Sequence, residues 1–324
     1  MKRLITFDDF IETYTKLNQR GLKFITSKFN FNEIERAKTA FNHSEILAAN
    51  WWIIPKVTAR WQRLITNTNH LSIEEFTVER FLSNKHNLKM LSLGSGDCSS
   101  ELAFATHSNF KDILCTDIAD KRLNKARAIA KNKGLNTIRF KILDANNLAS
   151  LKETFDVIYF KASLHHFKSI EHLLGTQLKQ ILKPDGLLII NEYVGPSRLQ
   201  FPKPQIKAIN EALQLIPKTY RKRYNLNLHK TKVYGPGLAR MVLADPSECI
   251  DSASIMPALH KHYSTVFEVG YGGNILTLKD IAHHFVNLND EKEAILNTLF
   301  DYEANYLKKH PSDHIFGIYK PNNK

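Results

Sequence analysis

Residues 88–98 of the 324-residue chain read Leu-Lys-Met-Leu-Ser-Leu-Gly-Ser-Gly-Asp-Cys, and the fold can be worked out from this stretch. A short apolar run ends at Gly94, and a stretch with helical character follows at residues 100–108. Glycine at 94 permits a tight turn from strand to helix, and glycine at 96 lets a ligand approach the backbone without meeting a Cβ. Two glycines alone are weak evidence. Their place between an apolar strand and a helix predicts a ligand-binding turn.

The pattern of strand then helix repeats along the chain. Further strands are expected at 112–117, 137–143, 155–160 and 187–193, with helices at 121–133 and 171–182 between them. Alternation of this kind implies right-handed crossovers and a mostly parallel sheet in an α/β fold. After residue 196 the pattern loosens into helices and a loop rich in Gly and Pro. A sixth strand is expected at 265–269, helices at 278–309 and a last strand at 313–319.

Four parts of the chain follow from this pattern. Residues 1–87 are expected to form a helical N-terminal extension or lid, with an amphipathic helix at 8–17. Ser44 is expected to cap a helix through residue 52, and Pro55 to restart it. Residues 88–195 form the core with strands one to five. Residues 196–262 are expected to form a helical insert that caps the substrate. Residues 263–324 are expected to form the C-terminal part of the core.

Carboxylates stand at the ends of two further strands. Asp117 ends the second strand, 21 residues beyond Gly96, where it can accept both ribose hydroxyls of an adenosine ligand. A polar strand end is the plainer interpretation of Asp117, and Asp120 competes for the role of helix cap. Asp144 ends the third strand, where it can accept a hydrogen bond from an adenine amino group. Three consecutive strand ends therefore predict one crevice at the carboxyl edge of the sheet.

The chain resembles class I S-adenosylmethionine-dependent methyltransferases in these motifs and in FDVIYFKASLHHF (155–167) and ILKPDGLLIINEYVGPSRLQF (181–201). The segment Asn-Glu-Tyr-Val-Gly-Pro, 191–196, is similar to bacterial small-molecule methyltransferases. The resemblance implies a Rossmann-like, mostly parallel seven-stranded sheet whose last strand is antiparallel, S-adenosylmethionine as cofactor and S-adenosylhomocysteine as product. The implied cofactor contacts are Gly94, Ser95, Gly96, Asp117, Ile118, Asp144, Ala145 and Lys161.

The sequence departs from the family in two places. The third glycine of the family's GxGxG is Cys98, and helices are expected to separate the last two strands, where the family has a hairpin. A nicotinamide cofactor is the rival ligand for the crevice. The dinucleotide fingerprint needs a third glycine at the position of Ser99 and a seat for a pyrophosphate. S-adenosylmethionine has no phosphates, so the absent glycine favours it over the dinucleotide.

The segment 161–166 faces the methyl donor in the resembled fold. It lacks the Asn/Asp-Pro-Pro-aromatic motif of nucleic-acid amino-methyltransferases, and it has no carboxylate, so no metal is expected. His165 or His166 could serve as general base for a hydroxyl or amine acceptor, or could cap the next helix. Glu192 could orient or deprotonate the acceptor, or pair with a lysine of the insert.

Aromatic residues supply the predicted substrate contacts. Tyr193 could pack against the sulfonium methyl. Trp52 could close over the cofactor, or it could belong to the core with its neighbour Trp51. Asp245-Pro-Ser-Glu248 fits a capping box, so helix initiation is preferred there to catalysis.

The composition of the chain limits which classes of binding partner are expected. The net charge is +13, but the lysines are spread along the chain without interleaved aromatics, which favours solvated helix faces over a nucleic-acid site. The chain shows no secretory signal or membrane span, and its three cysteines form no CxxC pair, so a cytoplasmic protein is expected. The leading hypothesis is methyl transfer to a small-molecule hydroxyl or amine. An RNA or protein methyltransferase, and a non-catalytic S-adenosylmethionine-binding protein, remain alternatives.

Overall fold

The computed structural model describes residues 3–20, 51–144, 148, 151–275 and 280–322. The chain divides into two compact units, and each is described by itself. The first unit comprises Met1–Trp61, Gly195–Glu248 and Gly270–His314, and the second comprises Gln62–Val194, Cys249–Val269 and Ile315–Lys324. The chain passes between the units five times, so neither unit is one continuous segment. The four parts predicted from the sequence stay a prediction.

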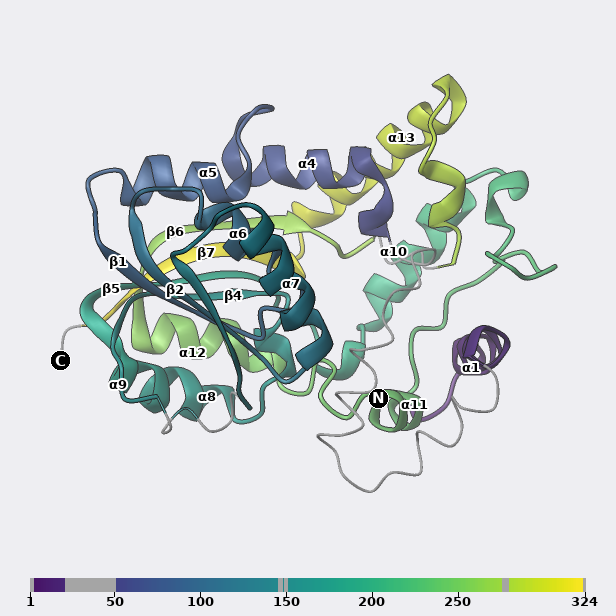
Figure 1. Cartoon of the computed structure of the whole chain (residues 1–324). Helices are drawn as coiled ribbons and strands as arrows, with labels where there is room; N and C mark the ends of the chain where they lie inside the picture. The colour runs from purple at the N-terminus through teal and green to yellow at the C-terminus, as the bar shows by residue number, and fades with distance from the viewer. Residues whose placement is uncertain (1–2, 21–50, 145–147, 149–150, 276–279, 323–324) are drawn as a thin grey trace. The chain divides into compact units, whose positions relative to one another are not determined.

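A seven-stranded sheet organises the second unit (Figure 1). Its order is β3-β2-β1-β4-β5-β7-β6, and the pairs β1–β2, β1–β4, β2–β3 and β4–β5 are parallel. The last strands are antiparallel, so the predicted Rossmann-like sheet is confirmed. The strands are β1 (Leu88–Leu93), β2 (Phe110–Asp117), β3 (Ile138–Ile142), β4 (Phe155–Lys161), β5 (Leu182–Tyr193), β6 (Tyr263–Gly272) and β7 (His314–Pro321).

The central strands are apolar because helices cover both faces of the sheet. Every residue of β1 except Lys89 is buried, and β4 is buried from Val157 to Phe160. Figure 1 shows α8, α9 and α12 below the sheet and α5 and α6 above it. The helices of the second unit are α5 (Ile73–Thr77), α6 (Ser99–Phe104), α7 (Asp120–Asn132), α8 (Ile170–His172), α9 (Leu178–Ile181) and α12 (Ile255–His262), and α4 (Pro55–Thr66) spans the boundary between the units.

The structure differs from the predicted helix at 171–182 and strand at 187–193. The helix is divided into α8, a π-helical turn at Leu173–Gln177 and α9. Gly175 lies in the turn, where a Cβ would come within 2.6 Å of the His262 ring. Strand β5 begins five residues early, at Leu182, which pairs with Phe155 across an irregular register.

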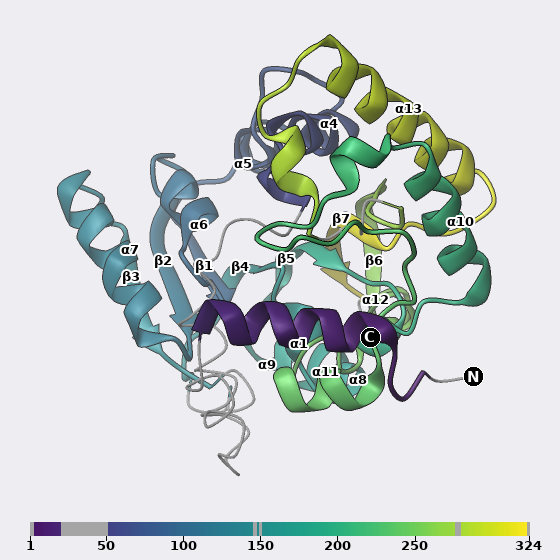
Figure 2. The same cartoon turned by 90° about the vertical axis from the view of Figure 1, so that its right-hand side faces the viewer.

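The first unit is helical and has its own core. Its helices are α1 (Phe7–Arg20), α10 (Lys203–Gln214), α11 (Leu238–Ala244) and α13 (Asp290–Leu307). Helices α10 and α13 lie side by side (Figure 2) and share a buried apolar cluster. Trp51 belongs to this cluster and stacks on Phe285, with ring centroids 6.1 Å apart. Helix α13 lies between β6 and β7 in sequence, so the expected departure from a hairpin is confirmed.

The predicted capping box at Asp245–Glu248 is wrong. Helix α11 ends at Ala244, Asp245 is its C-terminal cap residue, and a turn follows. The Asp245 carboxylate accepts from Ser247 N at 2.9 Å and from Ser247 Oγ at 2.6 Å, so it closes a turn instead of starting a helix. Helix α4 does begin at Pro55, as expected. The cap predicted at Ser44 lies outside the described residues.

Within the described ranges, no helix has both the length and the apolar composition that crossing a bilayer requires. The three cysteines are free and buried.

Candidate active site

The glycine turn after β1 is shaped by the loop after β4. Gly94 has a φ of +69°, and a Cβ there would come within 2.7 Å of the Ser163 Cβ. Ser163 Oγ donates to the Leu93 carbonyl at 2.7 Å, which holds the two loops together. Gly96 has a φ of +56°, and the nearest atom to a Cβ there is Arg122 Nη1 at 3.5 Å. Gly94 therefore serves the packing of two loops, whereas the face of Gly96 is open to a ligand.

Cys98 occupies the position of the family's third glycine. Its φ is +57°, in the left-handed region that glycine prefers, and its side chain is fully buried. A non-glycine residue in this conformation costs about 1–2 kcal/mol. The turn therefore keeps the family's backbone geometry without the family's residue.

Asp117 binds the glycine turn directly. Its Oδ2 accepts from Gly96 N at 2.8 Å and its Oδ1 accepts from Ala119 N at 2.7 Å. A carboxylate has about four acceptor positions, so these two bonds leave capacity for ribose hydroxyls. Leu143 N donates to the Asp117 carbonyl at 3.1 Å, which places half-buried Asp144 at the neighbouring strand end. The two predicted carboxylates therefore lie at adjacent positions on one edge.

Lys161, at the end of β4, belongs to a polar cluster that the sequence did not indicate. Its Nζ donates to Ser100 Oγ at 2.5 Å, and Ser100 Oγ donates to Glu74 on α5. The Lys161 ammonium lies 3.7 Å from Glu74 Oε1. The cluster holds a cation beside the first turn of α6. Glu74 is adjacent in sequence to Glu75, which forms a capping box with Ser72. The capping box indicates where the helix begins, but it does not indicate that the Glu74 side chain contacts Ser100 and Lys161.

Glu101 on α6 is a second acid that sequence analysis missed. It is 2 % exposed and accepts from Ser92 Oγ on β1 at 2.5 Å. Burial raises its pKa to about 7. A glutamate one turn into an amphipathic helix is ordinarily solvated, so no sequence pattern indicated that Glu101 is buried.

The predicted catalytic residues His165 and Glu192 are in contact. His165 lies in the 3₁₀ turn Leu164–His166 after β4, and its Nδ1 lies 2.8 Å from Glu192 Oε2. Glu192 is 1 % exposed, and its Oε1 accepts from Ser163 N at 2.5 Å and Leu164 N at 2.7 Å. Because an ionised carboxylate only accepts, Nδ1 carries the His165 proton, and Nε2 is the basic nitrogen. Glu192 is therefore a positioning residue for His165.

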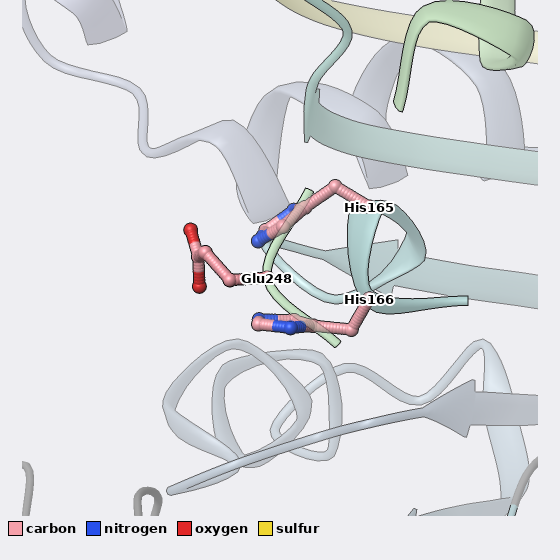
Figure 3. Close-up of side chains that lie close together, drawn as sticks. All are labelled: His165, His166 and Glu248. Atoms are coloured by element: carbon pink, nitrogen blue, oxygen red, sulfur yellow. The ribbon is translucent and has the colours of Figure 1, made fainter. Parts of the chain in front are cut away.

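His166 and Tyr193 lie beside this pair. The rings of His165 and His166 are 4.3 Å apart at 39°, and the Tyr193 ring lies 6.3 Å from His165. Figure 3 shows the imidazoles of His165 and His166 next to each other on the turn that follows β4.

The remaining predicted residues are distributed as follows. Ser95 N donates to the Thr116 carbonyl at 2.9 Å and ties the glycine turn to β2. Ile118 is half-buried after β2. Trp52 belongs to the first unit and is 57 % exposed, so its substrate role stays a prediction. Ala145 lies outside the described residues.

Part of the chain is similar to known proteins. Residues 84–234 match a family model described as a methyltransferase domain. This stretch of the chain is therefore similar to methyltransferase domains. An uncharacterized methyltransferase, YcgJ of Bacillus subtilis (strain 168), is 24% identical over 108 residues, which are 33% of this chain and 42% of YcgJ. The match thus spans less than half of that relative.

Solved structures also resemble the chain. The structure of YcgJ is 14% identical, with a TM-score of 0.40, and the alignment covers 74% of this chain and 94% of YcgJ. The [4+2]-cyclase SpnF is 15% identical, with a TM-score of 0.45 and coverage of 78% and 80%. A putative sarcosine dimethylglycine methyltransferase from Galdieria sulphuraria is 14% identical, with a TM-score of 0.41 and coverage of 76% and 84%.

Proposed function

We propose that this methyltransferase domain transfers the methyl group of S-adenosylmethionine to a hydroxyl or amine of a small molecule. The observation that carries the proposal is the contact between His165 and Glu192 at the carboxyl edge of the sheet. Three donors hold a buried carboxylate, and that carboxylate fixes the tautomer of one imidazole. Such an arrangement is typical of a general base.

The residues at this edge also suit the methyl donor. The open face of Gly96 admits a ligand against the backbone, and Asp117 and Asp144 offer acceptors for ribose and adenine. Lys161 offers a cation for the donor's carboxylate, since its ammonium is held at the start of α6. These features support S-adenosylmethionine as the ligand.

The chain's contribution to the chemistry would be placement and proton transfer. S-adenosylmethionine supplies an electrophilic methyl on a sulfonium, which is already a good leaving group. The protein then needs to hold the acceptor about 3 Å from that methyl and in line with the C–S bond. Nε2 of His165 takes the acceptor's proton, and Glu192 stabilises the imidazolium that results.

The acceptor must first be found, and this experiment also separates the alternatives. The purified chain is incubated with donor labelled in its methyl group and with a small-molecule metabolite extract, bulk RNA or bulk protein. We expect label in small molecules. Label confined to RNA or protein would assign the domain to a macromolecular acceptor, and no label with intact donor binding would support a non-catalytic binding protein.

The base is tested with that acceptor. His165→Gln should lower turnover about 10²–10⁴-fold at saturating acceptor and leave the affinity for S-adenosylhomocysteine unchanged. Glu192→Gln should lower turnover less and shift the pH profile, because it alters His165 without removing it. His166→Ala, which changes the neighbouring imidazole, is the matched control for His165→Gln. Turnover that is unchanged in all three variants would show that the domain works by proximity alone.

A further inference from the structure

A groove in the first unit is lined by none of the residues assigned to methyl transfer. It has a volume of about 860 Å³, which is within the range of small-molecule sites. One wall is a face of α10, and the other is the extended segment Thr231–Tyr234, with Arg3 and Ile5 adjoining. The α10 residues that line it are Lys203, Ile206, Lys207, Asn210, Glu211 and Gln214.

Hydrogen bonds fix the two walls to each other. The Asn210 amide accepts from Val233 N at 2.8 Å and donates to the carbonyls of Val233 and Ile206, both at 2.8 Å. Arg3 is fixed as well, because its Nη1 donates to the Phe201 carbonyl at 2.8 Å. The groove is therefore preformed by side chain to backbone bonds, and a ligand would not have to order it.

Cations dominate the lining of the groove. Its charged residues are four cations, Arg3, Lys203, Lys207 and Lys232, and one carboxylate, Glu211. Glu211 has its own partners, because it accepts from Tyr302 Oη at 2.5 Å and lies 3.7 Å from Lys207 Nζ. The Arg3 Nε is buried and has no hydrogen-bond partner. The groove therefore carries a net positive charge, which an anionic ligand would balance.

The body of the groove is apolar. Val233 is buried, Ile206 is half-buried, and Ile5 and Tyr234 are exposed at 62 % and 38 %. The Lys232 ammonium lies 5.0 Å from the centre of the Tyr234 ring, so a cation sits at the end of the apolar surface. Apolar surface beside an excess of cations matches a molecule with an apolar body and an anionic head.

We propose that this groove binds a small molecule that carries a phosphate or carboxylate on an apolar body. The proposal goes beyond methyl transfer and uses none of the residues of the candidate active site. Phosphate and carboxylate share the oxyanion chemistry that Arg3 and the lysines recognise, so the experiment must distinguish them.

Binding is measured on the full chain by calorimetry with octyl phosphate, octanoate, octyl glucoside and inorganic phosphate. We expect octyl phosphate or octanoate to bind at least about tenfold more tightly than octyl glucoside and inorganic phosphate. The stronger of the two identifies the head group. Equal affinity for octyl glucoside would overturn the anionic head, and equal affinity for inorganic phosphate would overturn the apolar body.

Variants locate the site. Lys203→Gln combined with Lys207→Gln should weaken octyl phosphate binding about tenfold. Lys309→Gln, an exposed lysine beyond α13, should leave it unchanged. Equal weakening in the control would show diffuse charge attraction and overturn the site, as would displacement of octyl phosphate by polyuridine at lower concentration than by octanoate. Unchanged S-adenosylhomocysteine binding in the double variant keeps this result separate from the proposed methyl transfer.

Discussion

At the scale of single residues, Glu101 makes the stability of the folded chain depend on pH. Its pKa is raised by burial to about 7, from an ordinary value of 4.5. Between these values the folded chain binds a proton that the unfolded chain has lost. The stability from this residue is therefore complete below pH 4.5 and is lost as pH rises through about 7.

We expect Glu101→Gln to stabilise the chain at pH 8.5 and to change little at pH 4.5. The neutral amide keeps an acceptor for Ser92 Oγ and never has to lose a proton in the interior. The free energy of unfolding at pH 8.5 should rise by up to about 3 kcal/mol. The pKa is raised from 4.5 to about 7, and each pKa unit corresponds to about 1.4 kcal/mol. Urea unfolding at both pH values measures it, with the exposed Glu79→Gln as control. A pH-independent difference between wild type and Glu101→Gln would contradict this account.

The histidine pair allows a second prediction at this scale. We expect turnover to survive EDTA, because the segment 161–166 brings no carboxylate of its own and Glu192 is committed to His165. The measurement is turnover after dialysis against chelator. A loss that zinc or manganese restores in wild type, but not in His166→Ala, would assign a metal to the pair of His165 and His166.

At the scale of elements, Lys161 depends on two helices. Its ammonium is held by Ser100 on α6 and by Glu74 on α5. We expect Lys161→Met to weaken S-adenosylhomocysteine binding about tenfold or more, since a charge-assisted bond to the ligand carboxylate is lost. Methylthioadenosine, which lacks the amino-acid portion, should bind both proteins equally. Calorimetry with the two ligands separates the effects, and equal weakening for both would place Lys161 outside the carboxylate site.

The contact between the β1 and β4 loops gives a further test. A Cβ on Gly94 would collide with Ser163 and would sit at a φ of +69°. Gly94→Ala should therefore destabilise the chain by about 2–4 kcal/mol in thermal or urea unfolding. Gly134→Ala is the matched control, because Gly134 has a similar φ of +66° and open space around its Cα. Equal losses in both variants would show that conformation alone, without the collision, accounts for the effect.

The sequence predicted those strands and helices that are marked by a local, periodic pattern of apolar residues. The strands were predicted from apolar runs that end in glycine or aspartate. The predicted strand ends also indicated that Gly96, Asp117 and His165 lie at one edge of the sheet. Contacts between distant segments were not predictable. Glu74 reaches Ser100 and Lys161, and Glu101 reaches Ser92, only after α5 and α6 have packed on the sheet. At Asp245 a local motif gave a wrong prediction. The sequence Asp245–Glu248 fits a capping box, but α11 ends at Ala244, directly before it, and no helix begins there.

At the scale of the whole molecule, the sheet depends on its last strand. Strand β7 lies between β5 and β6, so its loss removes the pairing partner of both. A chain that stops after Leu307 should lose cooperative unfolding and aggregate through the bare edge of β5. A chain that stops after Asn322 keeps every described strand and serves as control. Size-exclusion chromatography and thermal unfolding compare them, and a monomeric, cooperatively folded short chain would refute the expectation.

The position of β7 also bears on synthesis. A ribosome releases β1 to β5 long before β7, and the final strand that must fill the gap emerges only after α13. Until then the nascent chain carries an apolar strand edge and the three strands that bear Gly96, Asp117 and His165, with no completed sheet beneath them. Domains usually fold in the order in which they are made. Here the strand that completes the sheet is translated after the other six described strands, so a pause or a chaperone that acts between β6 and β7 would affect the yield of active protein.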